Sequence, residues 1–93
     1  MYIIFGFYKF KQLKKIRVLN KKLIKLIEIY NIKGTIIISS EGINGSISFL
    51  KKELNKININ IKKIFKISKF DNENSVLTKF VPFTKGRIKL KKE

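Results

Sequence analysis

The sequence contains no cysteine and no histidine. Disulfide bonds, thiolate catalysis, zinc sites of the usual Cys/His kind and imidazole general bases are therefore excluded. No apolar run reaches the length that a membrane-spanning helix needs. The apolar opening, Met1–Phe10, lacks a basic first region and a small-residue cleavage site, so we do not expect a signal peptide. From these absences we expect a cytoplasmic domain without a metal or other cofactor and without a membrane partner.

Acidic residues are scarce: six Asp and Glu stand against 22 Lys and Arg, which gives a net charge of +16. A polyanionic partner, with nucleic acid ahead of a membrane surface, would explain this imbalance. Composition explains part of it as well, because every cation except Arg17 and Arg87 is a lysine, and alanine is absent. A strongly AT-biased genome would encode such a chain. Whatever its origin, the charge favours nucleic acid and makes any such binding depend steeply on salt.

The first half of the chain has clear periodicity. Met1–Phe10 is β-branched and aromatic, with Ile3, Phe5 and Phe7 on one face, and both faces are apolar, which predicts a strand inside a sheet. Ile16–Tyr30 carries apolar residues at the spacing of three and four that is typical of a buried helical stripe. Asn31 is suited to end this helix in a left-handed cap.

The remaining elements are shorter. Gly34–Ser39 and Ser46–Leu50 are expected to pair as a hairpin, because Asn-Gly between apolar runs is a strong hairpin signal. Lys51–Ile67 fits both a period of two and a helical stripe, and its length favours a helix. The rest is predicted to be a polar loop at Phe70–Ser75 and two strands, Ser75–Phe80 and Arg87–Lys91.

This order of elements, β-α-β-β-α-β with an added strand, predicts the fold class. Two β-α-β halves around a central hairpin make an α+β, ferredoxin-like sandwich, in which two helices cover one face of an antiparallel sheet. We expect a single domain over residues 1–93, since a chain of this length buries one modest core. The second face of the sheet is left open.

The hairpin region and the end of the chain resemble a known family. Lys33–Phe49 reads KGTIIISSEGINGSISF and is similar to the pattern KGTILLAxEGINGTIAG of the rhodanese-related tRNA uridine hydroxylase family. Pro82-Phe83 and the final RIKLKKE resemble the family's PFxRLKVRLKKEIV, and FYKF matches its first strand. The resemblance covers essentially the whole chain, although Gly86 replaces a larger apolar residue of the pattern.

The resemblance implies an acylphosphatase-like N-terminal domain, followed in the family by a rhodanese domain that carries the catalytic cysteine. The family's reaction is the oxygen-dependent 5-hydroxylation of the wobble uridine of tRNA. This chain has no cysteine, and no rhodanese domain is present before Glu93, so we carry over no catalytic residue and expect no activity from the chain alone. We expect it to support the reaction by binding tRNA, by docking a rhodanese-like domain in cis or in trans, or by both. A general RNA-binding module and a non-catalytic relic of a reduced genome remain as alternatives.

Cations recur with period two in the last strand. This spacing places Arg87, Lys89 and Lys91 on one face, either as a solvated strand face or as a stripe that binds phosphates. Arg87 is the strongest single candidate, because a guanidinium group can grip a phosphate with two hydrogen bonds. The full set of candidate RNA-binding residues, all expected on the open face or just beyond it, is Lys79, Arg87, Lys89, Lys91 and Lys92.

The EGING motif allows a structural and a functional interpretation. In the first, Asn44-Gly45 closes the turn, Ile43 enters the core and Glu41 accepts N–H bonds of the loop. In the second, the loop contacts tRNA or a rhodanese domain; the charge of Glu41 argues against a pure phosphate nest. We interpret the stretch as a hairpin whose turn presents a recognition loop and not as a catalytic centre. The recognition residues are Glu41, Gly42, Asn44 and Gly45.

Three further hypotheses have less support. GFYKF resembles the aromatic core of an RNA-recognition-motif strand, which leaves stacking of a base on one exposed ring as a minor possibility. Acylphosphatase activity is disfavoured, because Phe10–Ile16 offers only lysines and Gln12 and has no glycine for a phosphate-binding turn. A membrane-surface role for Lys14–Lys25 ranks last, since the apolar stripe of that helix is needed by the sheet.

Overall fold

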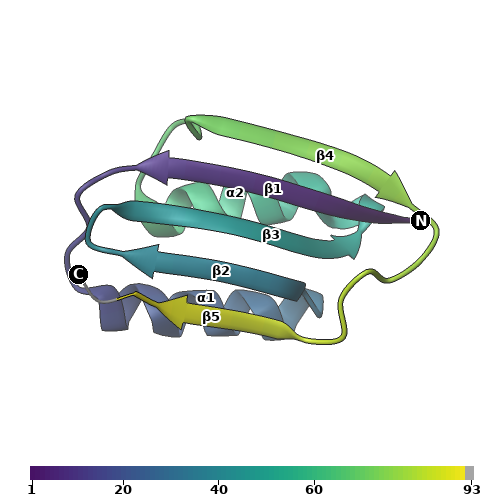
Figure 1. Ribbon diagram of the computed structural model, residues 1–93, viewed down its shortest axis with the longest axis horizontal. Helices are drawn as coiled ribbons and strands as arrows, with labels where there is room; N and C mark the ends of the chain where they lie inside the picture. Colours follow the sequence, from purple (N-terminus) through teal and green to yellow (C-terminus); the bar gives the residue numbers. More distant parts are fainter. Residues whose placement is uncertain (92–93) are drawn as a thin grey trace.

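Five strands form one sheet in the order β4-β1-β3-β2-β5, with two helices behind it (Figure 1). This computed structural model describes residues 1–91. The predicted α+β, ferredoxin-like class is confirmed, because two β-α-β units interleave around a central hairpin. In chain order the elements are β1 (Tyr2–Phe10), α1 (Ile16–Tyr30), β2 (Lys33–Ser39), β3 (Gly42–Leu50), the 3-10 turn η1 (Lys51–Glu53), α2 (Leu54–Phe65), β4 (Asn72–Thr78) and β5 (Gly86–Leu90).

The predicted antiparallel sheet is confirmed for four strands, and the added strand β5 makes the sheet mixed. The neighbours among β1 to β4 pair antiparallel, whereas β5 pairs parallel with β2. The reason lies in residues 79–85, which carry the chain from one edge of the sheet around its end to the other edge (Figure 1). The chain reverses along this path, so that β5 enters beside β2 in the same direction.

The core lies between the helices and one face of the sheet. Ile3, Phe5 and Phe7 of β1 are buried there, which confirms the alternation predicted for this strand. Helix α1 adds Leu23 and Leu26 of its predicted stripe. Helix α2 adds further apolar residues at helical spacing, so its sequence follows the helical and not the period-two interpretation: Ile57, Ile61 and Phe65.

Both helices end in the same way. Asn31, with a φ of 50°, is left-handed as predicted, and the Ile32 N–H donates to the Ile27 carbonyl at 3.0 Å. Lys66, with a φ of 55°, does the same for α2, where the Ile67 N–H donates to the Lys62 carbonyl at 3.0 Å. These are Schellman-type ends, which occupy carbonyls that a helix end leaves unpaired.

The fourth strand begins earlier than its sequence predicted. Asn72–Ser75 belong to β4 and not to a loop, and the strand ends at Thr78 instead of Phe80. Asn72, Asn74 and Val76 pair with Tyr8, Gly6 and Ile4 of β1 on the open face of the sheet. Because β4 is an edge strand with exposed residues, its sequence lacks the apolar alternation from which strands are usually recognised.

The hairpin turn also differs from the prediction. Ser39 pairs with Gly42, so the two-residue turn is Ser40-Glu41, and Asn44 and Gly45 lie inside β3 opposite Ile37 and Ile36. Gly42 has a φ of 151° and packs against the Lys9 carbonyl, where a side chain would not fit. The prediction that Asn44-Gly45 closes the turn was therefore wrong, while Ile43 is buried as expected.

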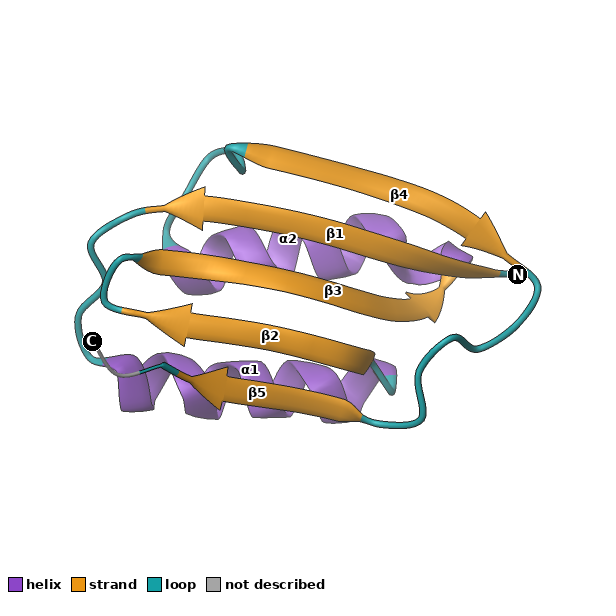
Figure 2. Ribbon diagram, in the orientation of Figure 1, coloured by secondary structure: helices purple, strands orange, loops and turns teal. Residues whose placement is uncertain are grey.

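Figure 2 shows α1 and α2 on one side of the sheet and no helix on the other. The uncovered side is called the open face below. Every second residue of each strand points to this face. Among them are Tyr8 and Phe10 of β1 and Arg87 and Lys89 of β5. Within residues 1–91, neither helix has both the length and the apolar character that crossing a membrane requires.

Candidate nucleic-acid interface

Three cations follow one another along the edge of the open face. Arg87 and Lys89 pair with Thr35 and Ile37 of β2, whose side chains point away from the helices. Lys91 comes directly after β5, and its N–H donates to the Ile38 carbonyl at 2.8 Å, so the backbone keeps strand pairing up to this residue. All three cations are exposed. We call Arg87, Lys89 and Lys91 the β5 stripe.

The other two predicted RNA-binding residues are not part of this stripe. Lys79 follows the end of β4, which is the edge of the sheet opposite to β5. Successive residues of a strand point to opposite faces of the sheet. Because Val76 and Thr78 point to the open face, Lys79 does not follow them there. Lys92 lies outside the described residues. The structure thus brings together three of the five predicted cations.

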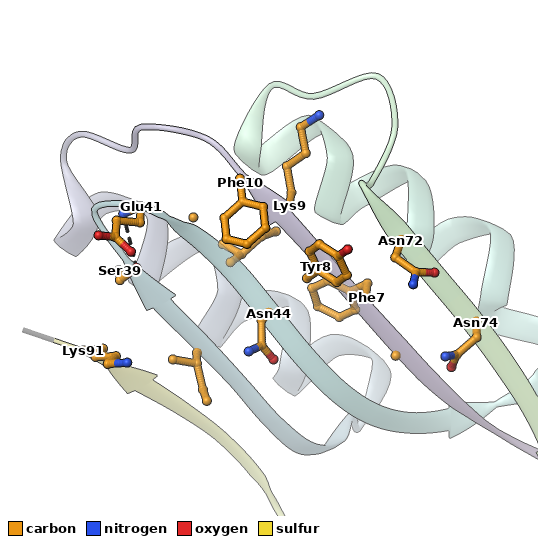
Figure 3. Close-up of a pocket in the computed structure, with 14 residues that line it drawn as sticks. Phe7, Tyr8, Lys9, Phe10, Ser39, Glu41, Asn44, Asn72, Asn74 and Lys91 are labelled. Atoms are coloured by element: carbon orange, nitrogen blue, oxygen red, sulfur yellow. Dashed lines mark hydrogen bonds between the residues drawn. The ribbon is translucent and has the colours of Figure 1, made fainter.

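A hollow of about 560 Å³ opens on the same face, between β4 and the β5 stripe. Figure 3 shows the side chains around it: Tyr8 and Phe10 come from β1, Asn44 from β3, Asn72 and Asn74 from β4, and Lys91 from the end of β5. Ser39 and Glu41 of the hairpin complete its rim. The hollow therefore combines aromatic rings, side-chain amides and a cation.

The aromatic residues of β1 divide between the two faces. Phe5 and Phe7 are 1% and 4% exposed and belong to the core, whereas Tyr8 and Phe10 are 39% and 74% exposed. The Tyr8 and Phe10 rings meet edge to face, with centroids 5.5 Å apart. Phe5 and Phe7 thus share the buried face, as their spacing predicted, and Tyr8 and Phe10 share the opposite face because they too are two residues apart.

Asp71 fixes the backbone beneath Phe10. Its carboxylate accepts the Phe10 N–H at 2.7 Å and the Lys9 Nζ at 3.2 Å, and its own N–H donates to the Tyr8 carbonyl at 2.9 Å. The bond from the Phe10 N–H holds the pKa of Asp71 below its ordinary value; partial loss of hydration opposes the shift, and Lys9 adds to it. The start of β4 is in this way tied to the end of β1.

The hairpin turn is fixed by its backbone. The Glu41 and Ser40 carbonyls accept the N–H groups of Lys11 and Leu13, both at 2.9 Å, and the Ser39 hydroxyl accepts the Glu41 N–H at 3.2 Å. Glu41 thus accepts loop N–H bonds as predicted, through its carbonyl oxygen. Of the predicted recognition residues, Glu41 and Asn44 present side chains to the hollow, while Gly42 and Gly45 are buried parts of β3.

The loop between β1 and α1 is turned toward its own neighbours. Two of its backbone N–H groups donate to carbonyls of the hairpin turn. The Lys11 ammonium donates to the Phe65 and Lys66 carbonyls at 3.0 and 2.9 Å. Those two carbonyls belong to the end of α2, where a cation is favourable. The loop therefore fastens the hairpin to α2 and does not present a row of N–H groups to an anion.

Comparison with known families agrees with this architecture. The model of the UPF0176 acylphosphatase like domain matches residues 2–93. The chain belongs to this family. The tRNA uridine(34) hydroxylase of Pelagibacter ubique (strain HTCC1062) is 45% identical over 97 residues, which cover 100% of this chain and 31% of the relative. The enzyme of the same name from Teredinibacter turnerae (strain ATCC 39867 / T7901) is 30% identical over 92 residues, or 99% of this chain and 28% of the relative.

The UPF0176 acylphosphatase like domain thus spans less than a third of the curated relatives that it matches. It corresponds to their N-terminal domain, so the family resemblance of the EGING motif and the terminal RIKLKKE is confirmed.

Three residues around the hollow, Tyr8, Asn72 and Asn74, were not predicted as site residues. Asn72 and Asn74 are two residues apart, a spacing that places them on one face of a strand. This spacing indicates a shared site only once β4 is known to pair with β1 beside Tyr8.

Solved structures show the same fold at low sequence identity. Full-length HypF, in a phosphate- and nucleotide-bound form, superposes with a TM-score of 0.66 at 15% identity over 97% of this chain and 12% of HypF. Acylphosphatase from Bacillus subtilis gives a TM-score of 0.62 at 8% identity over 95% of this chain and 98% of that protein. The acylphosphatase-like fold of this UPF0176 domain is therefore established, and the chemistry of its neighbours is not carried over with it.

Proposed function

We propose that this domain binds tRNA on its open face and thereby supports 5-hydroxylation of the wobble uridine. The reaction itself is assigned to a rhodanese-like domain, in cis or in trans, because the present chain has no cysteine. None of its residues is given a catalytic role. A cytoplasmic location is part of the proposal, since tRNA is the partner.

The observation that carries the proposal is the β5 stripe. Arg87, Lys89 and Lys91 share one exposed face of a paired strand, and no described helix covers that face. A row of cations at strand spacing, roughly 7 Å from one to the next, can engage successive phosphates of an RNA backbone. The printed names of the relatives supply the RNA class, and the net charge of +16 supplies the long-range attraction.

The test is the binding of tRNA as a function of salt. The wild-type chain is expected to bind tRNA at low salt, with an affinity that falls linearly in a log–log plot as salt is added. Arg87→Glu should weaken binding strongly, because it removes a phosphate contact and adds a repulsive charge to the stripe. Lys22→Glu, at an exposed position of α1 on the helical side, is the matched control and should weaken binding less.

Two results would contradict the proposal. Absence of tRNA binding at low salt would remove tRNA as a partner. Equal losses from Arg87→Glu and Lys22→Glu would mean that total charge attracts the RNA and that the open face has no special part in it. The second result would favour the general, composition-driven attraction that a lysine-rich sequence also predicts.

Support for hydroxylation needs a separate measurement. The domain should raise the yield of hydroxylated uridine when it is mixed with a separately produced rhodanese domain from a family member, tRNA and oxygen. The domain with Arg87→Glu should raise it less. An unchanged yield, under conditions in which the intact relative is active, would restrict the proposal to tRNA binding.

A further inference from the structure

The hollow on the open face has exposed aromatic rings that the core does not need. The Phe10 ring is 74% exposed and is in contact with Tyr8 on the same face. Aromatic side chains supply large apolar surfaces that normally become buried on folding or on binding. Uncovered sheet faces that present such rings are a recurrent means of holding unstacked bases of RNA.

Side-chain amides line the hollow without internal partners. Within residues 1–91, no hydrogen bond engages the side chains of Asn44, Asn72 and Asn74, whereas two asparagines of α2 are bonded within the fold. An amide group offers two donors and one acceptor with two lone pairs, which suits the edge of a nucleobase. The three asparagines therefore offer free hydrogen-bonding groups around the exposed rings.

Strand pairing places these groups in one row across the sheet. Asn72 pairs with Tyr8, Tyr8 with Asn44, Asn44 with Ile37, and Ile37 with Lys89. Neighbouring strands are about 4.8 Å apart, so Tyr8 and Lys89 lie roughly 14 Å apart at the backbone. The row thus begins with the Asn72 amide, the Tyr8 ring and the Asn44 amide, which Figure 3 shows, and it ends at Lys89 on the same face.

Small residues keep the floor of the hollow free. Gly6 lies beside Asn74 on the open face, and a Cβ at Gly6 would come within 3.0 Å of the Asn74 Oδ1. Gly42 pairs with Phe10 in the next row and adds no side chain there. Both glycines line the hollow.

Charge places a phosphate on the β5 side of the hollow. Lys91 and Glu41 both lie toward the hairpin end, Lys91 beside β2 and Glu41 in the turn. A phosphate would be attracted by Lys91 and repelled by Glu41. A nucleotide would therefore place its phosphate near Lys89 and Lys91 and its base toward the rings.

From these observations we propose that the hollow binds one unpaired nucleotide of single-stranded RNA. The base stacks on Phe10, whose ring meets Tyr8 edge to face, so that Tyr8 contacts the rim of the base. Its edge is hydrogen-bonded by Asn44 and by Asn72 or Asn74, and Lys91 contacts the adjoining phosphate. This inference rests on the proposed function, because it assigns an unpaired RNA base to the face that is proposed to hold tRNA. A base-paired nucleotide is excluded from such a site, since its faces are already stacked in the helix.

The experiment compares a short oligouridylate with an RNA duplex that carries the same number of phosphates. Phe10→Ala should weaken oligouridylate binding by roughly five- to hundredfold, the usual effect of removing one stacking ring. Duplex binding and the salt dependence of both RNAs should stay as in the wild type, because no charge is removed. Phe80→Ala is the matched control: Phe80 is 79% exposed, lies outside the hollow, and its loss should change neither affinity.

A second measurement does not depend on any variant. When oligouridylate is added to the wild-type chain, the ring protons of Phe10 and Tyr8 should shift in NMR spectra, and those of Phe80 should not. Asn44→Ala should also weaken oligouridylate binding more than duplex binding. Both readouts use a folded chain, and the exposed positions of Phe10 and Asn44 leave the core untouched.

The outcomes separate the two proposals. If no RNA binds at low salt, the proposed function fails and the nucleotide site fails with it. If RNA binds but Phe10→Ala matches the wild type, or loses oligouridylate and duplex equally, the nucleotide site alone is overturned. Selective loss of oligouridylate binding, together with shifts at Phe10 and Tyr8, supports the site.

Discussion

The ring of Phe7 lies directly against the backbone of Gly45. A Cβ at Gly45 would come within 2.5 Å of the Phe7 Cζ, a distance at which real side chains do not pack. The two residues are paired across β1 and β3. Gly45 of the EGING motif is thus needed for its lack of a side chain beneath a core aromatic ring.

Gly45→Ala should therefore destabilise the fold. Phe7 is 4% exposed and has no room to retreat, so the added methyl group overpacks the core, and the free energy of unfolding should fall by about 1–3 kcal/mol. Urea denaturation measures this change. Gly6→Ala is the control, because its methyl group meets only the movable end of Asn74; a loss equal to that of Gly45→Ala would contradict the packing argument.

Lys11 should stabilise the fold through the end of α2. Lys11→Met keeps the apolar stem but removes both charge-assisted bonds to the Phe65 and Lys66 carbonyls, and the free energy of unfolding should fall by about 1 kcal/mol. Amide exchange in the last turn of α2 should become faster. Lys14→Met, at an exposed position of the same loop, should change little; equal effects would mean that the two bonds do not contribute.

Asp71 should make stability depend on pH in acid. Since the Phe10 N–H lowers the pKa of Asp71 in the folded chain, its contribution is complete above the unfolded value of about 3.9 and is lost as the pH falls through the folded pKa. The urea midpoint of the wild type should therefore decrease in this range. Asp71→Asn should have a lower midpoint near neutral pH and a flatter profile in acid, whereas Glu28→Gln, exposed on α1, should keep the wild-type profile. A wild-type-like profile for Asp71→Asn would contradict this assignment.

The position of a cation, and not only its charge, should decide its effect on RNA binding. Lys89→Gln removes a member of the β5 stripe and should reduce the slope of log affinity against log salt by about one unit. Lys79→Gln removes the same charge at the opposite edge of the sheet and should reduce the slope less. Equal reductions would indicate that the lysines act through net charge alone.

The sequence predicted the parts of the fold that depend on local periodicity. The bounds of α1, Ile16–Tyr30, and the left-handed cap at Asn31 agree with the structure, because a helical stripe and a cap are encoded within a few residues. The alternation of Ile3, Phe5 and Phe7 agrees for the same reason. The faces of β5 also follow, with Ile88 toward α1 and Arg87 and Lys89 on the open face.

The errors arose where a residue serves a distant neighbour. Asn44-Gly45 has the composition of a turn, but the reason for Gly45 is Phe7, which lies on another strand. The polar start of β4 resembles a loop, because an edge strand on an open face has no need of apolar side chains. The hollow could not be predicted for the same reason: it exists only when β1, β3, β4 and the end of β5 are brought together.

The parallel addition of β5 has one more consequence. An outermost strand offers free N–H and C=O groups to any chain of matching shape, and proteins often protect such edges with lysine. Arg87, Lys89 and Lys91 stand along this strand, so two copies that approached each other edge to edge would meet through rows of like charge. The side chains that are proposed to attract RNA thus also oppose aggregation of the protein through pairing of its β5 edge strands.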